Sequence, residues 1–237
     1  MSATVVGEQL TLDLYRHRSA LFENYFKGGN AEVVEALQGL VRGHEGRAVY
    51  LWGAPGTGKT HLLQALCCAF MDSTGVAVVY LPLKDALMHG PDVCENVDSR
   101  QLVCIDDVDS IAGKPHWEQA VFALYNRMRD RGHTLVVSGE SSPRKSPLQL
   151  ADLHSRLGWG VVYQLRSLED SEKRALMIER ARGRGLTLAD DVAEYALRRL
   201  PRDIAGLCDF IDRVDKASLA AQRHVTIPFV RALLEMR

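Results

Sequence analysis

The sequence predicts a doubly wound α/β fold, a five-stranded parallel sheet covered by helices on both faces, followed by a small all-helical domain. Three observations predict it. Short, apolar, β-branched segments alternate with helical patterns from about residue 31 to residue 165. A glycine-rich turn joins the first apolar segment to the helix that follows it. After Leu165 the strand signals stop and only helical patterns remain.

The expected strands are short and apolar on both faces, as a sheet buried between two helical layers requires. They are Val49–Trp52, Val76–Leu81, Leu102–Ile105, Leu135–Val137 and Val161–Leu165. The helices expected between them carry apolar residues at a spacing of three and four. They are Ala31–Val41, Lys59–Met71 and Pro115–Arg131.

The residues after the last strand predict four more helices, at Glu169–Arg184, Asp190–Leu200, Arg202–Gln222 and Ile227–Met236. Thr226 is expected to cap the last of them, with Pro228 in its first turn. The chain is therefore expected to divide into an N-terminal segment (1–20), an α/β domain (21–166) and a helical domain (167–237).

The composition is that of an ordinary globular protein, with 46% hydrophobic and 25% charged residues in 237. A net charge of −1 argues against a surface devoted to nucleic acid across the whole chain, and leaves room for a local basic patch. The N-terminus lacks the pattern of a signal peptide, and no apolar run approaches the ~18 residues that span a membrane. We therefore expect a cytoplasmic protein without membrane contact.

The cysteines form no C-x-x-C pair, and their odd number makes a disulfide framework unfavourable. They are Cys67, Cys68, Cys94, Cys104 and Cys208. Reduced thiols, mostly buried, are expected.

Residues 53–60 match the pattern G-x-x-x-x-G-K-[ST] in full, between an expected strand and an expected helix. They are Gly53, Ala54, Pro55, Gly56, Thr57, Gly58, Lys59 and Thr60. Glycines let backbone N–H groups turn toward an anion, and the helix N-terminus adds partial positive charge. Lys59 is expected to reach the β- and γ-phosphates of a nucleotide and Thr60 to hold Mg²⁺. We place His61 in the same nucleotide-binding set. The alternative is a glycine-rich turn that binds nothing.

Asp106 and Asp107 follow the apolar strand that ends at Ile105. A carboxylate at a strand end beside a phosphate loop is the second half of such a nucleotide site. Asp106 is expected to bind Mg²⁺ through water, and Asp107 to orient or deprotonate the attacking water. The alternative is a pair that only caps the strand end.

Together these residues resemble the AAA+ domain of the bacterial replication initiator DnaA. The resemblance covers about residues 20–237 and includes five segments in the family's order. These are residues 22–30, the phosphate loop, the paired aspartates, residues 155–160 (SRLGWG) and residues 201–204 (PRDI). It implies an AAA+ domain with a helical lid, and an adenine nucleotide (ADP or ATP) beside Phe22 and Tyr25.

The resemblance also assigns roles to single side chains. Arg156 becomes an arginine finger that completes the site of a neighbouring protomer, and a surface ion pair is the alternative. Arg202 becomes a second sensor that points at phosphates bound in the same chain, and a solvated first-turn arginine is the alternative. Ser138 and Glu140 stand where the first sensor belongs, although the initiator has an aspartate in place of Glu140.

Residues 9–14 (QLTLDL) resemble the short peptide by which bacterial proteins dock on the sliding clamp, the β subunit of DNA polymerase III. Gln9 is expected to form hydrogen bonds, while Leu10, Leu12 and Leu14 fill apolar pockets. A DnaA-like domain with this peptide resembles the regulatory inactivators of the initiator. That resemblance implies an ADP-bound, replisome-associated inhibitor of DNA replication that makes initiator DnaA hydrolyse its ATP.

No residues remain after the expected lid for the initiator's helix-turn-helix domain, so DNA is expected to be reached only indirectly, through the clamp. A homodimer is also expected if the N-terminal peptide docks on a neighbouring copy. The protein's own ATPase activity is expected to be weak or absent. Two other hypotheses stand beside this one. In the first, the chain is an autonomous AAA+ ATPase, such as a helicase loader or a remodelling factor. In the second, it is an initiator paralogue that binds DNA through Arg144 and Lys145.

Overall fold

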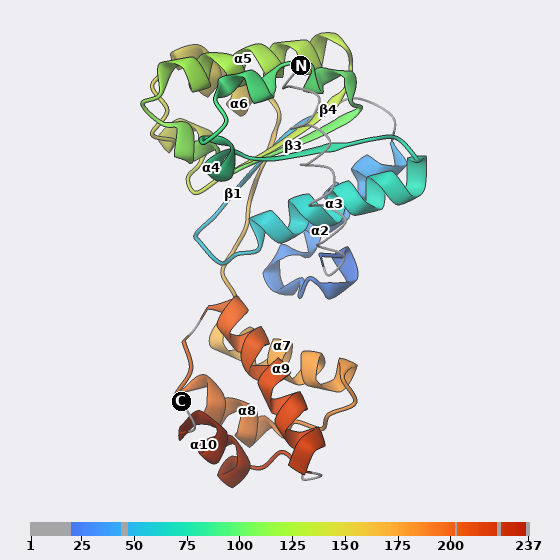
Figure 1. Ribbon diagram of the computed structural model, residues 1–237, viewed down its shortest axis with the longest axis vertical. Coiled ribbons are helices and arrows are strands. Elements are labelled where there is room, and N and C mark those ends of the chain that lie inside the picture. Colours follow the sequence, from blue (N-terminus) through green and yellow to red (C-terminus); the bar gives the residue numbers. More distant parts are fainter. Residues whose placement is uncertain (1–19, 44–46, 202, 222–223, 236–237) are drawn as a thin grey trace. The chain divides into compact units, whose positions relative to one another are not determined.

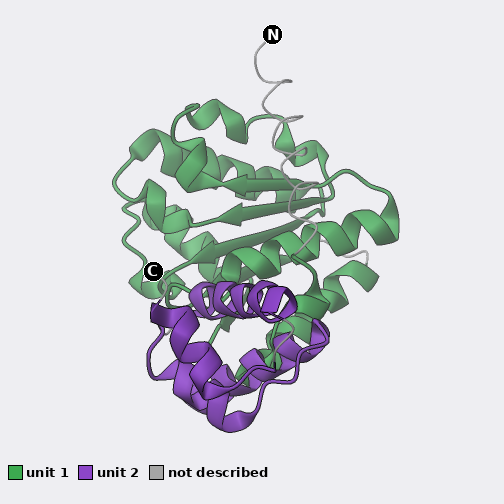
Figure 2. Ribbon diagram, turned by 60° about the horizontal axis from the view of Figure 1, so that its bottom comes forward, with its two compact units in different colours: residues 1–166 green, residues 167–237 purple. Residues whose placement is uncertain are grey.

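Five parallel strands form one sheet in the order β2-β3-β4-β1-β5 (Figure 1). Their bounds are β1 Ala48–Trp52, β2 Val79–Pro82, β3 Leu102–Asp106, β4 Thr134–Gly139 and β5 Val161–Gln164. The computed structural model describes residues 20–43, 47–201, 203–221 and 224–235. It divides into two units, Met1–Arg166 and Ser167–Arg237, which Figure 2 colours separately.

Helices cover both faces of the sheet in the first unit (Figure 1). They are α2 Ala31–Arg42, α3 Lys59–Thr74, α4 Leu83–Ala86, α5 Pro115–Asp130 and α6 Ala151–Trp159. The 3-10 turns are Phe22–Asn24, Gly28–Asn30, Pro91–Cys94, Val97–Ser99, Val108–Ile111 and Pro143–Lys145. The predicted doubly wound parallel sheet is therefore confirmed.

Alternation along the strands gives each face its own hydrophobic core. Leu51 and Cys104 point into the core formed with α2 and α3. Their neighbours Tyr50 and Ile105 point into the core formed with α5 and α6. Because successive strand residues face opposite sides, a strand buried on both faces is apolar throughout.

Four features of the sheet unit differ from the prediction, and one of them is the short helix α4, which was not predicted. β2 begins at Val79, because Val79 is the first residue of this segment that pairs with β3. β5 is not buried on both faces: it lies at the sheet edge with β1 as its strand partner, and Val161 and Val162 are exposed. Helix α6 was not predicted, since its small residues and its glycine give it a weak apolar pattern.

The second unit contains four helices around its own core. They are α7 Asp170–Gly183, α8 Asp190–Leu197, α9 Ile204–Ala221 and α10 Ile227–Glu235. The predicted caps are present at the last of them, where the Thr226 hydroxyl accepts a hydrogen bond from the Phe229 N–H at 3.4 Å. Glu169 and Glu172 form a reciprocal capping box at α7. The predicted helical domain is confirmed.

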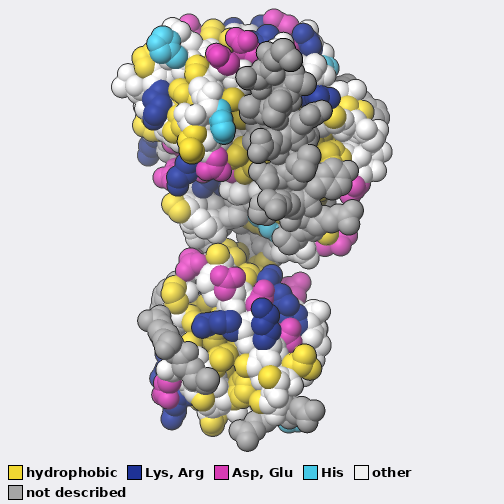
Figure 3. Space-filling view, in the orientation of Figure 1, with side chains coloured by type: hydrophobic (Ala, Val, Ile, Leu, Met, Phe, Trp, Pro, Cys, Tyr) yellow, Lys and Arg dark blue, Asp and Glu magenta, His cyan; other side chains and the backbone are white. Residues whose placement is uncertain are grey.

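The surface drawn in Figure 3 mixes positive and negative side chains in each unit. This agrees with the near-zero net charge of the chain. None of the described helices is long and apolar enough to cross a membrane. All five cysteines lie in the described part of the chain and none of them forms a disulfide there, with Cys67, Cys94 and Cys104 buried.

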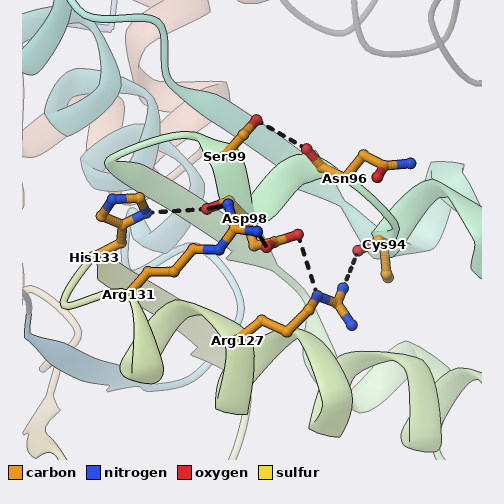
Figure 4. A network of polar contacts seen from close by, with 7 residues as sticks. All are labelled: Cys94, Asn96, Asp98, Ser99, Arg127, Arg131 and His133. Atoms are coloured by element: carbon orange, nitrogen blue, oxygen red, sulfur yellow. Dashed lines mark hydrogen bonds and ion pairs between the residues drawn. The ribbon is translucent and has the colours of Figure 1, made fainter.

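Asp98 is a buried carboxylate that ties a loop to the end of α5 (Figure 4). Arg127 Nε donates to its Oδ1 at 3.2 Å, and Arg131 Nη2 lies 2.9 Å from its Oδ2. Arg127 also donates to the Cys94 carbonyl at 2.7 Å, and His133 Nδ1 lies 3.0 Å from the Asp98 carbonyl oxygen. Since His133 immediately precedes β4, this network fixes the loop between β2 and β3 against the next strand.

Replacing Asp98 with alanine is expected to lower the free energy of unfolding of the sheet unit by about 2 kcal/mol, because hydrogen bonds to a charged group are lost. The Arg127 and Arg131 side chains are partly exposed, at 37% and 53%, so water can solvate their charges when Asp98 is removed. The melting temperature should fall by roughly 4–8 °C. Asp130→Ala is the matched control: it removes an exposed ion pair with Arg129 and should leave the melting temperature nearly unchanged. Equal effects of the two variants would contradict the role given to Asp98.

Candidate functional site

The turn between β1 and α3 has the backbone shape of a phosphate loop. Gly56 and Gly58 have φ angles of +81° and +89°, a region that favours glycine. A Cβ atom on Gly58 would lie 2.5 Å from Cε2 of Tyr25, and one on Gly53 would lie 2.5 Å from the carbonyl oxygen of Leu165. Side chains are therefore excluded at both positions. Only glycine lets the loop lie this close to its neighbours.

Lys59 begins α3 and is buried, with 7% of its surface exposed. Its Nζ donates to the carbonyl oxygens of Gly53 at 2.7 Å and Ala54 at 3.2 Å. The ammonium therefore lies within the loop, next to the positive end of a 16-residue helix. A phosphate group is the ligand that fits backbone N–H groups, a helix N-terminus and an ammonium in this arrangement. Thr60 follows in the first turn of α3 and is exposed.

Tyr25 forms one wall of the loop. Its hydroxyl donates to the Thr57 carbonyl at 3.0 Å and accepts from Asn30 Nδ2 at 3.2 Å. Burial raises the pKa of Tyr25 to about 12, so the hydroxyl keeps its proton. Asn30 also donates to the Arg166 carbonyl at 3.0 Å and accepts from the Arg166 N–H at 2.8 Å. Asn30 thus joins the start of the sheet unit to the segment that follows β5; the sequence placed it only in the segment 22–30, without this contact.

The other two residues expected beside the nucleotide lie near Tyr25. The ring centroid of His61 is 5.8 Å from that of Tyr25, and His61 Nε2 is 2.9 Å from the Leu21 carbonyl oxygen. Phe22 is buried in the core formed with α2 and α3. It also lines a cavity of about 450 Å³ between the first 3-10 turn, α2 and α3.

Asp106 ends β3 as a buried carboxylate with both oxygens engaged. The Tyr80 hydroxyl donates to its Oδ2 at 2.7 Å, and the Ser138 hydroxyl donates to its Oδ1. Ser138 also accepts the Asp107 N–H at 3.0 Å, so it links the two aspartates. Sequence reasoning missed Tyr80. Tyr80 lies in β2, which pairs with β3, so a prediction of that pairing would have placed Tyr80 near Asp106.

Asp107 has a φ of +56°, a conformation rare for a residue with a side chain. Burial raises the pKa of its carboxyl group, and the nearby charge of Asp106 raises it further, while Lys59 lowers it. A carboxylate with a raised pKa is a better proton acceptor than a free one. Asp107 thus carries a carboxyl group with a raised pKa directly beside the buried carboxylate of Asp106.

Few protein groups near these aspartates are available to a metal. The described residues contain no group of three or more His, Cys, Asp or Glu side chains that could hold an ion. Mg²⁺ does not need such a group, because it is commonly held by one or two protein oxygens, nucleotide phosphates and water. Asp106 and the Thr60 hydroxyl supply oxygens of that kind.

Glu140, predicted together with Ser138 at the first sensor position, is exposed, and its backbone N–H donates to Asp109 Oδ2.

Arg156 lies on α6, on the other helical layer. Its guanidinium carbon is 4.0 Å from the ring centroid of Trp159 and 5.9 Å from that of Phe122. Its Nη1 is buried and has no hydrogen-bond partner. Trp159 is 63% exposed, so the guanidinium rests on a ring at the surface. Trp159 belongs to the predicted segment 155–160, but its contact with Arg156 was not predicted, because α6 was not predicted as a helix.

Two groups of predicted site residues lie outside the described part of the chain. Arg202 is one, and the predicted clamp-binding residues Gln9, Leu10, Leu12 and Leu14 are the other.

Two family models match the chain. The model for the bacterial DnaA ATPase domain matches residues 16–164. The model for the Hda lid domain matches residues 170–234. The first covers the sheet unit and the second covers the helical unit.

Solved structures of replication initiators share the fold. Domain III of DnaA from Thermotoga maritima is 21% identical, with a TM-score of 0.77, over 92% of this chain and 97% of that one. A DnaA bound to AMPPCP and single-stranded DNA is 20% identical, with a TM-score of 0.73, over 87% of this chain and 69% of that one. AMPPCP-bound DnaA from Aquifex aeolicus is 21% identical, with a TM-score of 0.71, over 85% and 66%.

Proposed function

This chain belongs to the DnaA-like AAA+ family and carries an Hda-type lid, and we propose from this that it is a regulator that inactivates the replication initiator DnaA. Bound to adenine nucleotide and docked on the DNA-loaded sliding clamp, it stimulates hydrolysis of the ATP held by the initiator. The observation that carries the proposal is Arg156, whose guanidinium stacks on the exposed ring of Trp159 at the surface of α6.

The nucleotide of this chain has a structural and regulatory part in the proposal. Support for its binding comes from the glycine geometry of residues 53–58 and from the buried ammonium of Lys59. AMPPCP, an adenine nucleotide, is bound in two of the similar initiator structures. ADP is the expected ligand, with Mg²⁺ held by Thr60 and Asp106. Arg202 is expected to contact its phosphates.

The reaction itself takes place in the initiator. Water attacks the γ-phosphorus, the bond to the β–γ bridging oxygen breaks, and the water's proton passes to solvent or a base. Negative charge builds on the transferred group and on the leaving ADP. Arg156 would donate hydrogen bonds to those oxygens from the planar fork of donors in its guanidinium. Such a finger is worth about 10³–10⁵ in rate.

Docking on the clamp is assigned to residues 9–14. Replacing Gln9 and Leu10 with alanine is expected to reduce binding to the clamp at least tenfold, because one hydrogen-bonding side chain and one apolar anchor are lost together. Co-elution of the protein with clamp loaded on circular DNA measures this. ADP binding and melting temperature should stay as in the unmodified protein. Full retention of the double variant on the clamp would remove the docking role.

A reconstituted reaction tests the whole proposal. DnaA loaded with γ-labelled ATP is mixed with clamp-loaded DNA and this protein, and release of phosphate is followed. Release should be slow in the absence of this protein or of the clamp, and fast when all are present. No acceleration in the complete mixture would refute the proposal.

A second candidate function is supported by the intact aspartate pair. Asp106, Asp107 and Ser138 form one hydrogen-bonded group, which an autonomous ATPase of the helicase-loader or remodelling type would also need. The same experiment separates the two functions. Substantial ATP hydrolysis by this protein alone would favour the autonomous enzyme.

A further inference from the structure

Glu118 is a buried carboxylate on α5, with 1% of its surface exposed. Its Oε2 accepts the backbone N–H groups of Gln149 at 2.8 Å and Leu150 at 2.6 Å. Its Oε1 accepts the N–H of Gly113 at 2.9 Å. Three backbone donors therefore converge on one side chain.

A buried charge is costly unless hydrogen bonds or a counter-ion compensate for it. Among the ion pairs found within the described residues, none involves Glu118. The backbone N–H groups must compensate instead, and they do so only while residues 149 and 150 keep their positions. Two of the three donors belong to the loop that ends at Leu150, so the carboxylate is tied mainly to the position of this loop.

The loop that Glu118 holds leads directly into the helix of Arg156. Leu150 is the N-cap residue of α6, and Arg156 lies in the second turn, roughly 9 Å along the axis from the cap. Leu153 and Leu157 bury one face of α6 in the core shared with α5. Apolar packing fixes which face is buried but resists sliding only weakly, whereas directed hydrogen bonds at the helix start fix its position along the axis.

We propose that Glu118 is a positioning residue for the finger: by holding the N–H groups of Gln149 and Leu150, it sets where α6 begins and so where the Arg156 guanidinium is presented. This inference rests on the proposed function. Glu118 does not touch the initiator's nucleotide, and it acts through α6. Misplacing a catalytic group by about 1 Å can cost ~10²-fold in rate, so a small shift of α6 has a large effect.

The test replaces Glu118 with glutamine, which has nearly the same size but turns one acceptor oxygen into an N–H donor facing backbone donors. The rate of initiator ATP hydrolysis at saturating protein is expected to fall about tenfold or more. The concentration that gives half of the maximal rate should change less than twofold, because the docking surface is unaltered. Gln119→Ala, at the adjacent exposed position of α5, is the matched control and should change neither quantity. An unchanged maximal rate, or a loss in binding alone, would overturn the inference.

A second readout does not depend on activity. Amide hydrogen exchange of the ADP-bound protein should speed up in residues 149–159 of Glu118→Gln, and stay unchanged in residues 53–74. If the unmodified protein does not stimulate hydrolysis, the proposed function fails, and unchanged exchange in the variant would separately overturn the claim that Glu118 fixes α6.

Leu150→Pro keeps the test valid if Glu118→Gln does not fold. It removes the N–H that Glu118 accepts most closely, at a residue whose φ of −76° suits proline. The maximal rate should fall in the same direction but less, since two of the three donors remain. A rate equal to that of the unmodified protein would contradict the proposal.

Discussion

Replacing Arg156 with alanine is expected to abolish stimulation of initiator ATP hydrolysis, with a loss of about 10³-fold or more in the stimulated rate. The side chain stacks on Trp159 and leaves Nη1 unpaired, so its removal takes away the guanidinium without breaking a hydrogen bond of Nη1. Binding of ADP and docking on the clamp should persist, because Lys59 and residues 9–14 are unchanged. Phosphate release in the reconstituted reaction, together with ADP binding by dialysis, measures both.

Two further variants sharpen the result. Arg156→Lys keeps the charge but not the planar fork of donors, and should recover only a small part of the stimulated rate. Arg144→Ala removes an exposed arginine on the 3-10 turn Pro143–Lys145 and should stimulate normally. Normal stimulation by Arg156→Ala would show that the finger is another residue.

Replacing Lys59 with alanine is expected to weaken ADP binding about 100-fold, since charge-assisted hydrogen bonds to phosphate are worth about 1.5–3 kcal/mol. A ligand at 100 times its dissociation constant stabilises the folded protein by about 2.7 kcal/mol. At the same ADP concentration the variant should gain only about 0.4 kcal/mol. The rise in melting temperature on adding ADP should therefore nearly disappear.

The comparison uses the increment caused by ADP, because Lys59 also bonds the Gly53 and Ala54 carbonyls and its loss changes the ligand-free protein. Lys114→Ala is the control: this lysine is exposed, and its ammonium donates to the Ser110 carbonyl at 2.8 Å. It should retain the full ADP increment. An undiminished increment in Lys59→Ala would mean that the loop does not hold the nucleotide phosphates.

The elements that could be predicted are those whose signal is local. The phosphate loop needs glycine at fixed positions between a strand and a helix, and all of its residues are contiguous in sequence. Asp106 and Asp107 follow a strand whose apolar run is equally local. Helix α6 escaped prediction because its buried face is made by Leu153 and Leu157 alone. The edge position of β5 was not predicted, because the order of strands in a sheet depends on which strands pair, and the residues of one strand alone do not show this.

The sequence by itself determined the strand–loop–helix unit of the phosphate site, the apolar strands that are buried on both faces, and the cap of the last helix. Only the tertiary structure decided which side chains meet across long separations: Asn30 with Arg166, Tyr80 with Asp106, and Glu118 with the start of α6. The physical reason is the sequence distance over which each effect acts. Backbone conformation and periodicity depend on near neighbours, whereas a buried polar group needs a partner from wherever the packed chain supplies one.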